Sequence, residues 1–254
     1  MGLPSLSACL QLFRVALHLA WGGLQTALVF PFADIGRRDR MKQRWSRELL
    51  NLLRIEIDAA DPALESLEGG LLVANHVSFI DIFVINALLP SGFVAKSDVA
   101  TWPLIGWLSR HNETVFIERG SRKAAHQTQK HMLDVLERGR RLTLFPEGTT
   151  TLGTSVLPFH GALFQSAVDA AVPVHALVIR YVDANGMAST APAYIGDTSL
   201  LDCLLNILGS GGVRARLQLA ESFLPPSAER RQLAHRSHQA IASRLQRYLC
   251  REIS

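Results

Sequence analysis

The first hydrophobic feature of the chain is an almost continuous apolar stretch from Ala8 to Phe32. A helix of this length is long enough to span a bilayer, which needs about 20 apolar residues. Polar side chains interrupt the stretch (Gln11, Arg14, His18 and Gln25), and a central arginine alone costs roughly 2.5–3.5 kcal/mol on insertion scales. We therefore favour an interfacial or half-inserted helix over a fully spanning one. No Lys or Arg precedes the stretch and no small-residue cleavage site follows it, so we expect no cleaved signal peptide.

The next segment, residues 37–54, has the pattern of a basic amphipathic helix. Apolar residues recur at helical spacing (Met41, Trp45, Leu49, Leu52 and Leu53). The segment holds seven basic and two acidic residues, a local excess of +5 against +4 for the whole chain. Together with the apolar stretch, it predicts an anchor on an anionic membrane surface, with the charges on the cytoplasmic side. The alternative is an N-terminal core helix followed by a solvated helix.

From residue 71 onward, short apolar runs alternate with amphipathic segments. The runs predict strands at residues 71–74, 93–95, 114–117, 142–145 and 174–181, and the segments between and after them predict helices at 79–89, 121–138 and 228–253. This order predicts an α/β fold with a mostly parallel central sheet covered by helices on both faces. Residues 198–213 indicate no more than an apolar helix and a loop.

Composition narrows the classes of protein that the chain can belong to. Its 254 residues suffice for one large α/β domain, and 48% hydrophobic content is high for a soluble protein. The three cysteines (Cys9, Cys203 and Cys250) have neither paired nor metal-like spacing, so a reducing compartment is the default and we expect no metal or other cofactor. The basic segment adjoins an apolar anchor and no recognition motif is present, which disfavours nucleic-acid binding.

Three polar side chains follow predicted strands closely. His76, Arg119 and Glu147 each lie one to three residues beyond the end of a strand. Sites in open parallel sheets form at the carboxyl ends of strands. The segment from Val115 to Phe145 predicts a right-handed βαβ unit, so Arg119 and Glu147 should share one edge of the sheet.

The segment Asn75–Asp81 brings an imidazole and a carboxylate close together. His76 suits a general base because its side chain titrates near neutral pH in model compounds. Asp81 suits the carboxylate that orients the imidazole and stabilises the imidazolium. Alone, His76 reads better as an ordinary turn histidine, and Ser78 with Asp81 also fits a capping box, so both roles of Asp81 remain open.

The motif Asn75–Asp81, the block Val115–Arg119 and the block Phe145–Thr149 together resemble the lysophosphatidic acid acyltransferase family. The likeness extends over about residues 70–182, through the segments 93–97, 103–107, 157–164 and 172–174. It implies that residues 57–254 form a catalytic domain and that residues 1–56 attach it to the membrane.

The resemblance also implies an activity and a set of site residues. The enzyme would move a fatty acyl group from acyl-CoA or acyl-carrier protein to the hydroxyl of a lysophospholipid, with His76 and Asp81 catalytic. The acceptor's phosphate and glycerol would be bound by Arg119, Glu147 and Gly148. Further substrate contacts are expected from Asn75, Ser78, Lys96 and Thr149.

One departure from the family pattern concerns the acceptor. Many members carry Arg after the threonine of the Phe145–Thr149 block, whereas Thr150 stands here. This variant, with Tyr194–Asp197 downstream, resembles the branch that acylates lyso-ornithine lipid, whose acceptor lacks a phosphate. Two other classes stay open: a non-catalytic lipid-binding membrane module, and a thioesterase, for which Ser78 is no convincing nucleophile.

Overall fold

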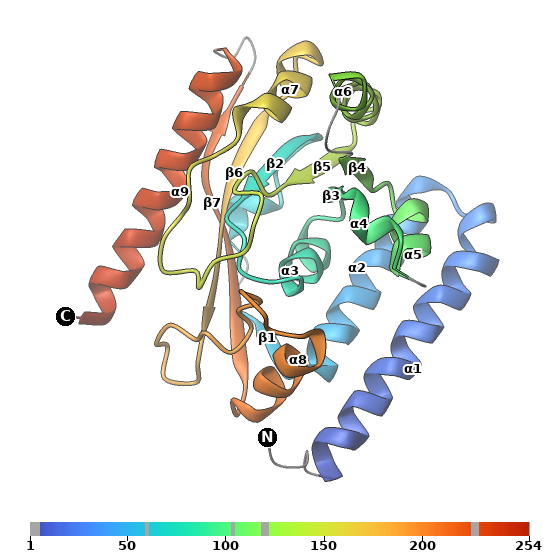
Figure 1. Cartoon of the computed structure of the whole chain (residues 1–254), viewed down its shortest axis with the longest axis vertical. Helices are drawn as coiled ribbons and strands as arrows, with labels where there is room; N and C mark the ends of the chain where they lie inside the picture. Colours follow the sequence, from blue (N-terminus) through green and yellow to red (C-terminus); the bar gives the residue numbers. More distant parts are fainter. Residues whose placement is uncertain (1–5, 59–60, 103–104, 118–121, 225–228, 254) are drawn as a thin grey trace.

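The centre of the molecule is a seven-stranded sheet (Figure 1). The computed structural model describes residues 6–58, 61–102, 105–117, 122–224 and 229–253. The strand order is β1-β7-β6-β2-β5-β3-β4, and neighbouring strands are parallel except for the antiparallel pair β6 and β7. The strands are β1 (Ile55–Ile57), β2 (Gly70–Ala74), β3 (Gly92–Lys96), β4 (Val115–Ile117), β5 (Arg141–Leu144), β6 (Val174–Val182) and β7 (Val213–Phe223).

Helices cover both faces of the sheet, which confirms the predicted α/β architecture. The α-helices are α1 (Leu6–Leu28), α2 (Ile35–Leu52), α3 (Ile80–Leu88), α4 (Ser97–Ala100), α5 (Ile105–His111), α6 (Arg122–Glu137), α7 (Gln165–Asp169), α8 (Leu200–Gly209) and α9 (Arg230–Ile253). Short 3-10 helices are η1 (Phe30–Phe32), η2 (Pro62–Leu64) and η3 (Gly161–Phe164).

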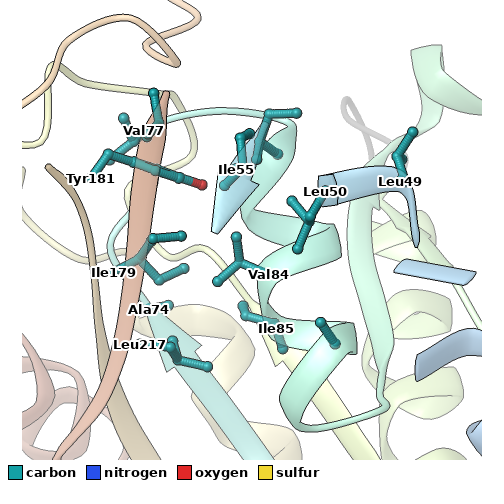
Figure 2. Close-up of a cluster of buried hydrophobic side chains, with 14 of the residues drawn as sticks. Leu49, Leu50, Ile55, Ala74, Val77, Val84, Ile85, Ile179, Tyr181 and Leu217 are labelled. Carbon is teal, nitrogen blue, oxygen red and sulfur yellow. The ribbon is translucent and has the colours of Figure 1, made fainter. Parts of the chain in front are cut away.

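Two buried cores form because successive side chains of a strand point to opposite faces of the sheet. Leu72 and Ala74 of β2 join α2, α3 and α8 in one core, part of which Figure 2 shows. Leu71 and Val73 of the same strand join α6, α7 and α9 in the other. β2 and β6 are buried along their whole length, as expected for central strands whose sequence is almost continuously apolar.

The sheet departs from the sequence prediction in two places. β4 and β5 run parallel, as predicted for the βαβ unit, but β3 lies between them, so the crossover passes over one strand. β1 and the long strand β7 were not predicted, and they extend the sheet beyond β6. Residues 198–213 hold α8, where an apolar helix was expected, and the start of β7.

The two N-terminal helices lie antiparallel along one side of the molecule (Figure 1). The side chain of Gln11 donates to the carbonyl of Leu52 at 2.6 Å. The rings of His18 and Trp45 stack with centroids 4.8 Å apart, and each side chain also bonds the other residue's carbonyl. Gly22 makes room for Trp45, because a Cβ there would lie 2.5 Å from the indole nitrogen. The polar face of α1 therefore packs on α2.

The second helix belongs to the same core as the sheet. Leu49, Leu50 and Leu53 are buried with residues of β2 and α3, so the amphipathic pattern of residues 37–54 marks a face that packs inward. Trp45, expected on a membrane-facing surface, contacts His18 and Phe83 instead. The prediction for Trp45 was wrong because the apolar face of an amphipathic helix can pack on a neighbouring helix as well as on a membrane.

Candidate active site

His76 and Asp81 face each other at the carboxyl end of β2. His76 lies in the loop after the strand, and Asp81 lies in the first turn of α3. The Nδ1 atom of His76 is 2.8 Å from Oδ2 of Asp81, whose side chain is fully buried. With Nδ1 engaged by the carboxylate, Nε2 is the ring nitrogen that can accept a proton. The imidazole remains 20% exposed, so it is accessible to solvent.

Asp81 contacts the backbone before α3 as well as the imidazole. Its Oδ2 also accepts hydrogen bonds from the backbone N–H groups of Val77 and Ser78, at 2.7 and 3.0 Å. The N–H of Asp81 donates to the carbonyl of Ser78 rather than to its hydroxyl, and the N-cap of α3 is Phe79, so the reciprocal bonds of a capping box are not formed. Its other oxygen, Oδ1, accepts from the hydroxyl of Tyr181 at 2.6 Å. The carboxylate thus holds the loop before α3 and faces the imidazole at the same time.

An aromatic ring fixes the other side of the imidazole. Phe145 stacks on His76 with ring centroids 4.0 Å apart and an interplanar angle of 13°. Phe145 begins the turn that follows β5, the strand next to β2. The sequence included Phe145 in a motif but gave it no role, because the motif alone does not show what its ring touches.

Glu147 binds backbone N–H groups of the site. One carboxylate oxygen accepts from the N–H of His76 at 2.7 Å and the other from the N–H of Leu157 at 2.8 Å. The side chain is 4% exposed. Burial raises the pKa of Glu147 above its usual value, although these N–H donors and His76 act in the opposite direction. Glu147 therefore connects the loop after β2 to the loop after β5.

The residue after Glu147 has the backbone conformation of a turn. Gly148 has a φ of +68°, a region that glycine adopts without steric cost, and its N–H donates to the carbonyl of Phe145. A Cβ at this position would lie 3.4 Å from the His160 ring, so the glycine also allows a close approach. Thr149, the next residue, is exposed.

The threonines that follow this turn hold the loop of His76. The backbone N–H of Thr151 donates to the carbonyl of His76 at 2.8 Å. Thr150 donates its hydroxyl to the carbonyl of Tyr194, and the N–H of Tyr194 donates to the carbonyl of Val77 at 3.0 Å. Thr150, which stands where many family members carry Arg, thus has a structural contact.

The remaining predicted site residues lie in different environments. Asn75 and Ser78 are fully buried, and the Asn75 amide makes two hydrogen bonds to the backbone of Ile179. Lys96 is exposed at the end of β3. Arg119 lies outside the described residues.

In the part of the chain that the structure describes, no group of three or more His, Cys, Asp or Glu side chains is arranged to hold a metal ion. What the structure brings together is a histidine–carboxylate pair at the carboxyl edge of a mostly parallel sheet. This arrangement has the form of a general-base site for transfer to a hydroxyl.

Comparison with known proteins identifies the class. The family model described as Acyltransferase matches residues 56–180. A 1-acyl-sn-glycerol-3-phosphate acyltransferase of Neisseria meningitidis is 39% identical over 67% of this chain and 67% of its own length. A lyso-ornithine lipid O-acyltransferase of Pseudomonas aeruginosa is 37% identical over 87% of this chain and 84% of its own. The chain belongs to this acyltransferase family.

A solved structure supports the same fold. The crystal structure of the 1-acyl-sn-glycerophosphate acyltransferase PlsC from Thermotoga maritima superposes with a TM-score of 0.70 over 95% of both chains, at 18% identity. At this identity the likeness shows the fold alone. In this chain, the sheet covered by helices on both faces and the N-terminal apolar helix match the architecture predicted from the sequence.

Proposed function

We propose that this protein transfers a fatty acyl group from an acyl thioester to the free hydroxyl of a lysophospholipid, with 1-acylglycerol-3-phosphate as the acceptor and phosphatidic acid as the product. The observation that carries the proposal is the contact of 2.8 Å between His76 and the buried carboxylate of Asp81. The family membership supports the reaction type, and the relative from Neisseria meningitidis supports the acceptor.

The proposed chemistry needs few groups. Nε2 of His76 takes the proton of the acceptor hydroxyl while the oxygen attacks the thioester carbonyl. Asp81 stabilises the imidazolium that forms. The tetrahedral intermediate then expels the thiolate, which receives the proton from His76. Oxygen has replaced sulfur on the acyl carbon, and no covalent enzyme intermediate is required.

A second acceptor, lyso-ornithine lipid, is favoured by one specific observation. Thr150 donates its hydroxyl to the carbonyl of Tyr194 and brings no positive charge to the turn after Glu147. A phosphate would be bound better by an arginine, which offers a bidentate fork. The relative from Pseudomonas aeruginosa, which is named for this acceptor, also aligns with more of the chain than the Neisseria meningitidis relative does.

Membrane attachment through α1 is part of the proposal. The segment Leu6–Phe32 is long and apolar enough to cross a membrane by length and composition. Its polar face packs on α2, and its outer face exposes an apolar stripe at helical spacing: Leu6, Leu10, Phe13, Leu17, Trp21, Leu24 and Leu28. This supports an interfacial helix lying in the membrane surface. Exposed arginines of α2 (Arg37, Arg40 and Arg44) favour the cytoplasmic face.

The test measures thiol release by the protein in vesicles, with either acyl-CoA or acyl-carrier protein as donor. Lysophosphatidic acid, lyso-ornithine lipid or no acceptor is added. Release that needs lysophosphatidic acid supports the main proposal, and release that needs lyso-ornithine lipid changes the acceptor. Release without acceptor would make the protein a hydrolase. No release with either donor would favour a non-catalytic lipid-binding module.

The role of His76 has its own prediction. His76→Ala should lower turnover by about 10²- to 10⁴-fold, the usual contribution of a general base, and leave the fold intact. The matched control is His126→Ala, which removes an exposed histidine of α6. Near-normal turnover in His76→Ala would refute the assignment of the base.

A further inference from the structure

Tyr181 contacts the carboxylate oxygen of Asp81 that His76 does not contact. It is near the carboxyl end of β6, and its hydroxyl donates to Oδ1 of Asp81 at 2.6 Å. Asp81 is fully buried and Tyr181 is 3% exposed. Figure 2 shows the ring of Tyr181 among the apolar side chains of the core, beside Val77 and Ile55.

The two oxygens of Asp81 are held in different ways. Oδ2 accepts from three donors, which are His76 and the N–H groups of Val77 and Ser78. Oδ1 points into the apolar core, where the structure records the hydroxyl of Tyr181 as its donor. A buried carboxylate oxygen without a donor is costly, so loss of this hydroxyl would favour rotation of the carboxylate or its protonation.

We propose that Tyr181 is a positioning residue of the acyl transfer, which holds the carboxylate of Asp81 in the rotamer that orients His76. The inference rests on the proposed function, because it needs His76 as the base. It assigns a task to a side chain that lies 100 residues from Asp81 in sequence.

The chemistry of Tyr181 suits this task. Burial and the neighbouring carboxylate of Asp81 raise the pKa of Tyr181 well above its usual value, so the phenol keeps its proton and remains a donor. A phenylalanine would fill the same volume of core. The hydroxyl therefore has a separable role, and its removal leaves most of the packing in place.

The test is Tyr181→Phe, measured with both substrates varied. We expect kcat to fall roughly tenfold, the effect of losing one hydrogen bond to a charged group, while the KM values for donor and acceptor stay within a factor of two. The matched control is Tyr248→Phe, which removes the hydroxyl of a tyrosine on α9 whose ring lies under Arg180. Its kcat should equal that of the wild type.

A double-mutant comparison separates positioning from simple packing. If Tyr181 acts through Asp81, then Tyr181→Phe should cause no further loss of kcat in the Asp81→Asn background. An equal loss in both backgrounds, per folded molecule, would overturn the proposal, as would an unchanged kcat in the single variant. If His76→Ala keeps near-normal turnover, the proposed base fails. If only Tyr181→Phe is silent, the positioning role fails alone.

A second measurement needs no substitution at Tyr181. In protein labelled with ¹³C-tyrosine, the buried phenol proton of Tyr181 should exchange slowly and give a proton NMR signal. That signal should shift in Asp81→Asn, because its acceptor has lost its charge. An unchanged signal would overturn the proposed contact even if Tyr181→Phe failed to fold.

Discussion

Substitution of Glu147 can separate a structural role of its carboxylate from a role in acceptor binding. The resemblance to the family implies contact with the acceptor, whereas the structure shows both oxygens bound to the N–H groups of His76 and Leu157, at 2.7 and 2.8 Å. Glu147→Ala leaves both buried donors without this acceptor. At about 1–3 kcal/mol for each, the free energy of unfolding should fall by about 2–6 kcal/mol.

Glu147→Gln should cost less than the alanine substitution. Its amide oxygen keeps one of the two contacts, so one orphaned donor costs about 1–3 kcal/mol. Removing the buried charge offsets part of that loss, because burial raises the pKa of Glu147. A carboxyl with a raised folded-state pKa contributes stability that is present at low pH and lost as pH rises through that pKa. The difference between wild type and Glu147→Gln should therefore shrink as pH rises.

The assay combines urea unfolding at several pH values with steady-state kinetics. A structural clamp predicts that Glu147→Gln lowers kcat, since the backbone of His76 shifts, while the acceptor KM stays nearly constant. The reasoning would be refuted by a large rise in acceptor KM with unchanged kcat and stability. It would also be refuted if Gln cost as much stability as Ala.

Two further predictions concern regions away from the pair formed by His76 and Asp81. Trp21→Ser should weaken binding to anionic vesicles about tenfold or more in a co-sedimentation assay, because it removes a large exposed apolar side chain from α1. The control is Met187→Ser, which changes an exposed side chain at a turn. An equal loss of binding in both variants would contradict an anchor on α1. Arg140→Met should lower the free energy of unfolding by about 2–4 kcal/mol at pH 7, since Arg140 bonds both Asp39 and Glu113. Burial alone would raise the pKa of both carboxyls, but Arg140 and Lys42 hold these pKa values below their usual range. The stability that the two ion pairs contribute is therefore lost in acid, and the difference in unfolding free energy between wild type and Arg140→Met should narrow below about pH 4. An equal difference in urea titrations at pH 7 and pH 3 would contradict this prediction.

The sequence predicted the centre of the sheet well because its strands carry a strong local signal. The run 71–74 became β2 at Gly70–Ala74, and the run 174–181 became β6 at Val174–Val182. The strand β7 was missed although its sequence alternates between buried and partly exposed positions from Val213 to Gln218. That alternation is a usable signal for a strand, but the antiparallel pairing with β6 depends on the whole fold.

The dyad was predictable because His76 and Asp81 are only five residues apart. Tyr181 was not, since its contact with Asp81 depends on the register of β2 and β6, in which Ala74 lies opposite Leu177. No local pattern fixes that register. The only hint in the sequence is a polar hydroxyl at the end of an apolar strand, which more often marks a partly exposed strand end.

The N-terminus illustrates a limit of periodicity. The apolar face of residues 37–54 was predicted to contact a membrane, but helical periodicity does not show whether such a face packs on a membrane or on another helix. Trp45 packs on His18, and Lys42 is 8% exposed and paired with Asp39. The apolar face that remains outside belongs to α1, whose near-continuous hydrophobicity concealed the polar contact face at Gln11 and His18.

The loop of His76 explains why motifs about seventy residues apart must occur together. The segment from Asn75 to Ser78 forms no helix or strand, so its buried backbone groups need other partners. Glu147 accepts the N–H of His76, and Thr151 donates to its carbonyl. Tyr194 donates to the carbonyl of Val77.

Each of these partners comes from a different segment of the chain than His76, the proposed base. Asp81 completes the set by accepting the N–H groups of Val77 and Ser78. The position of the imidazole is therefore determined jointly by the segment after β5, the first turn of α3 and the segment after β6. A general base must lie within hydrogen-bond reach of the proton that it removes, and a displacement of about 1 Å can lower the reaction rate strongly. Substitutions at these supporting residues should consequently lower kcat before they weaken substrate binding.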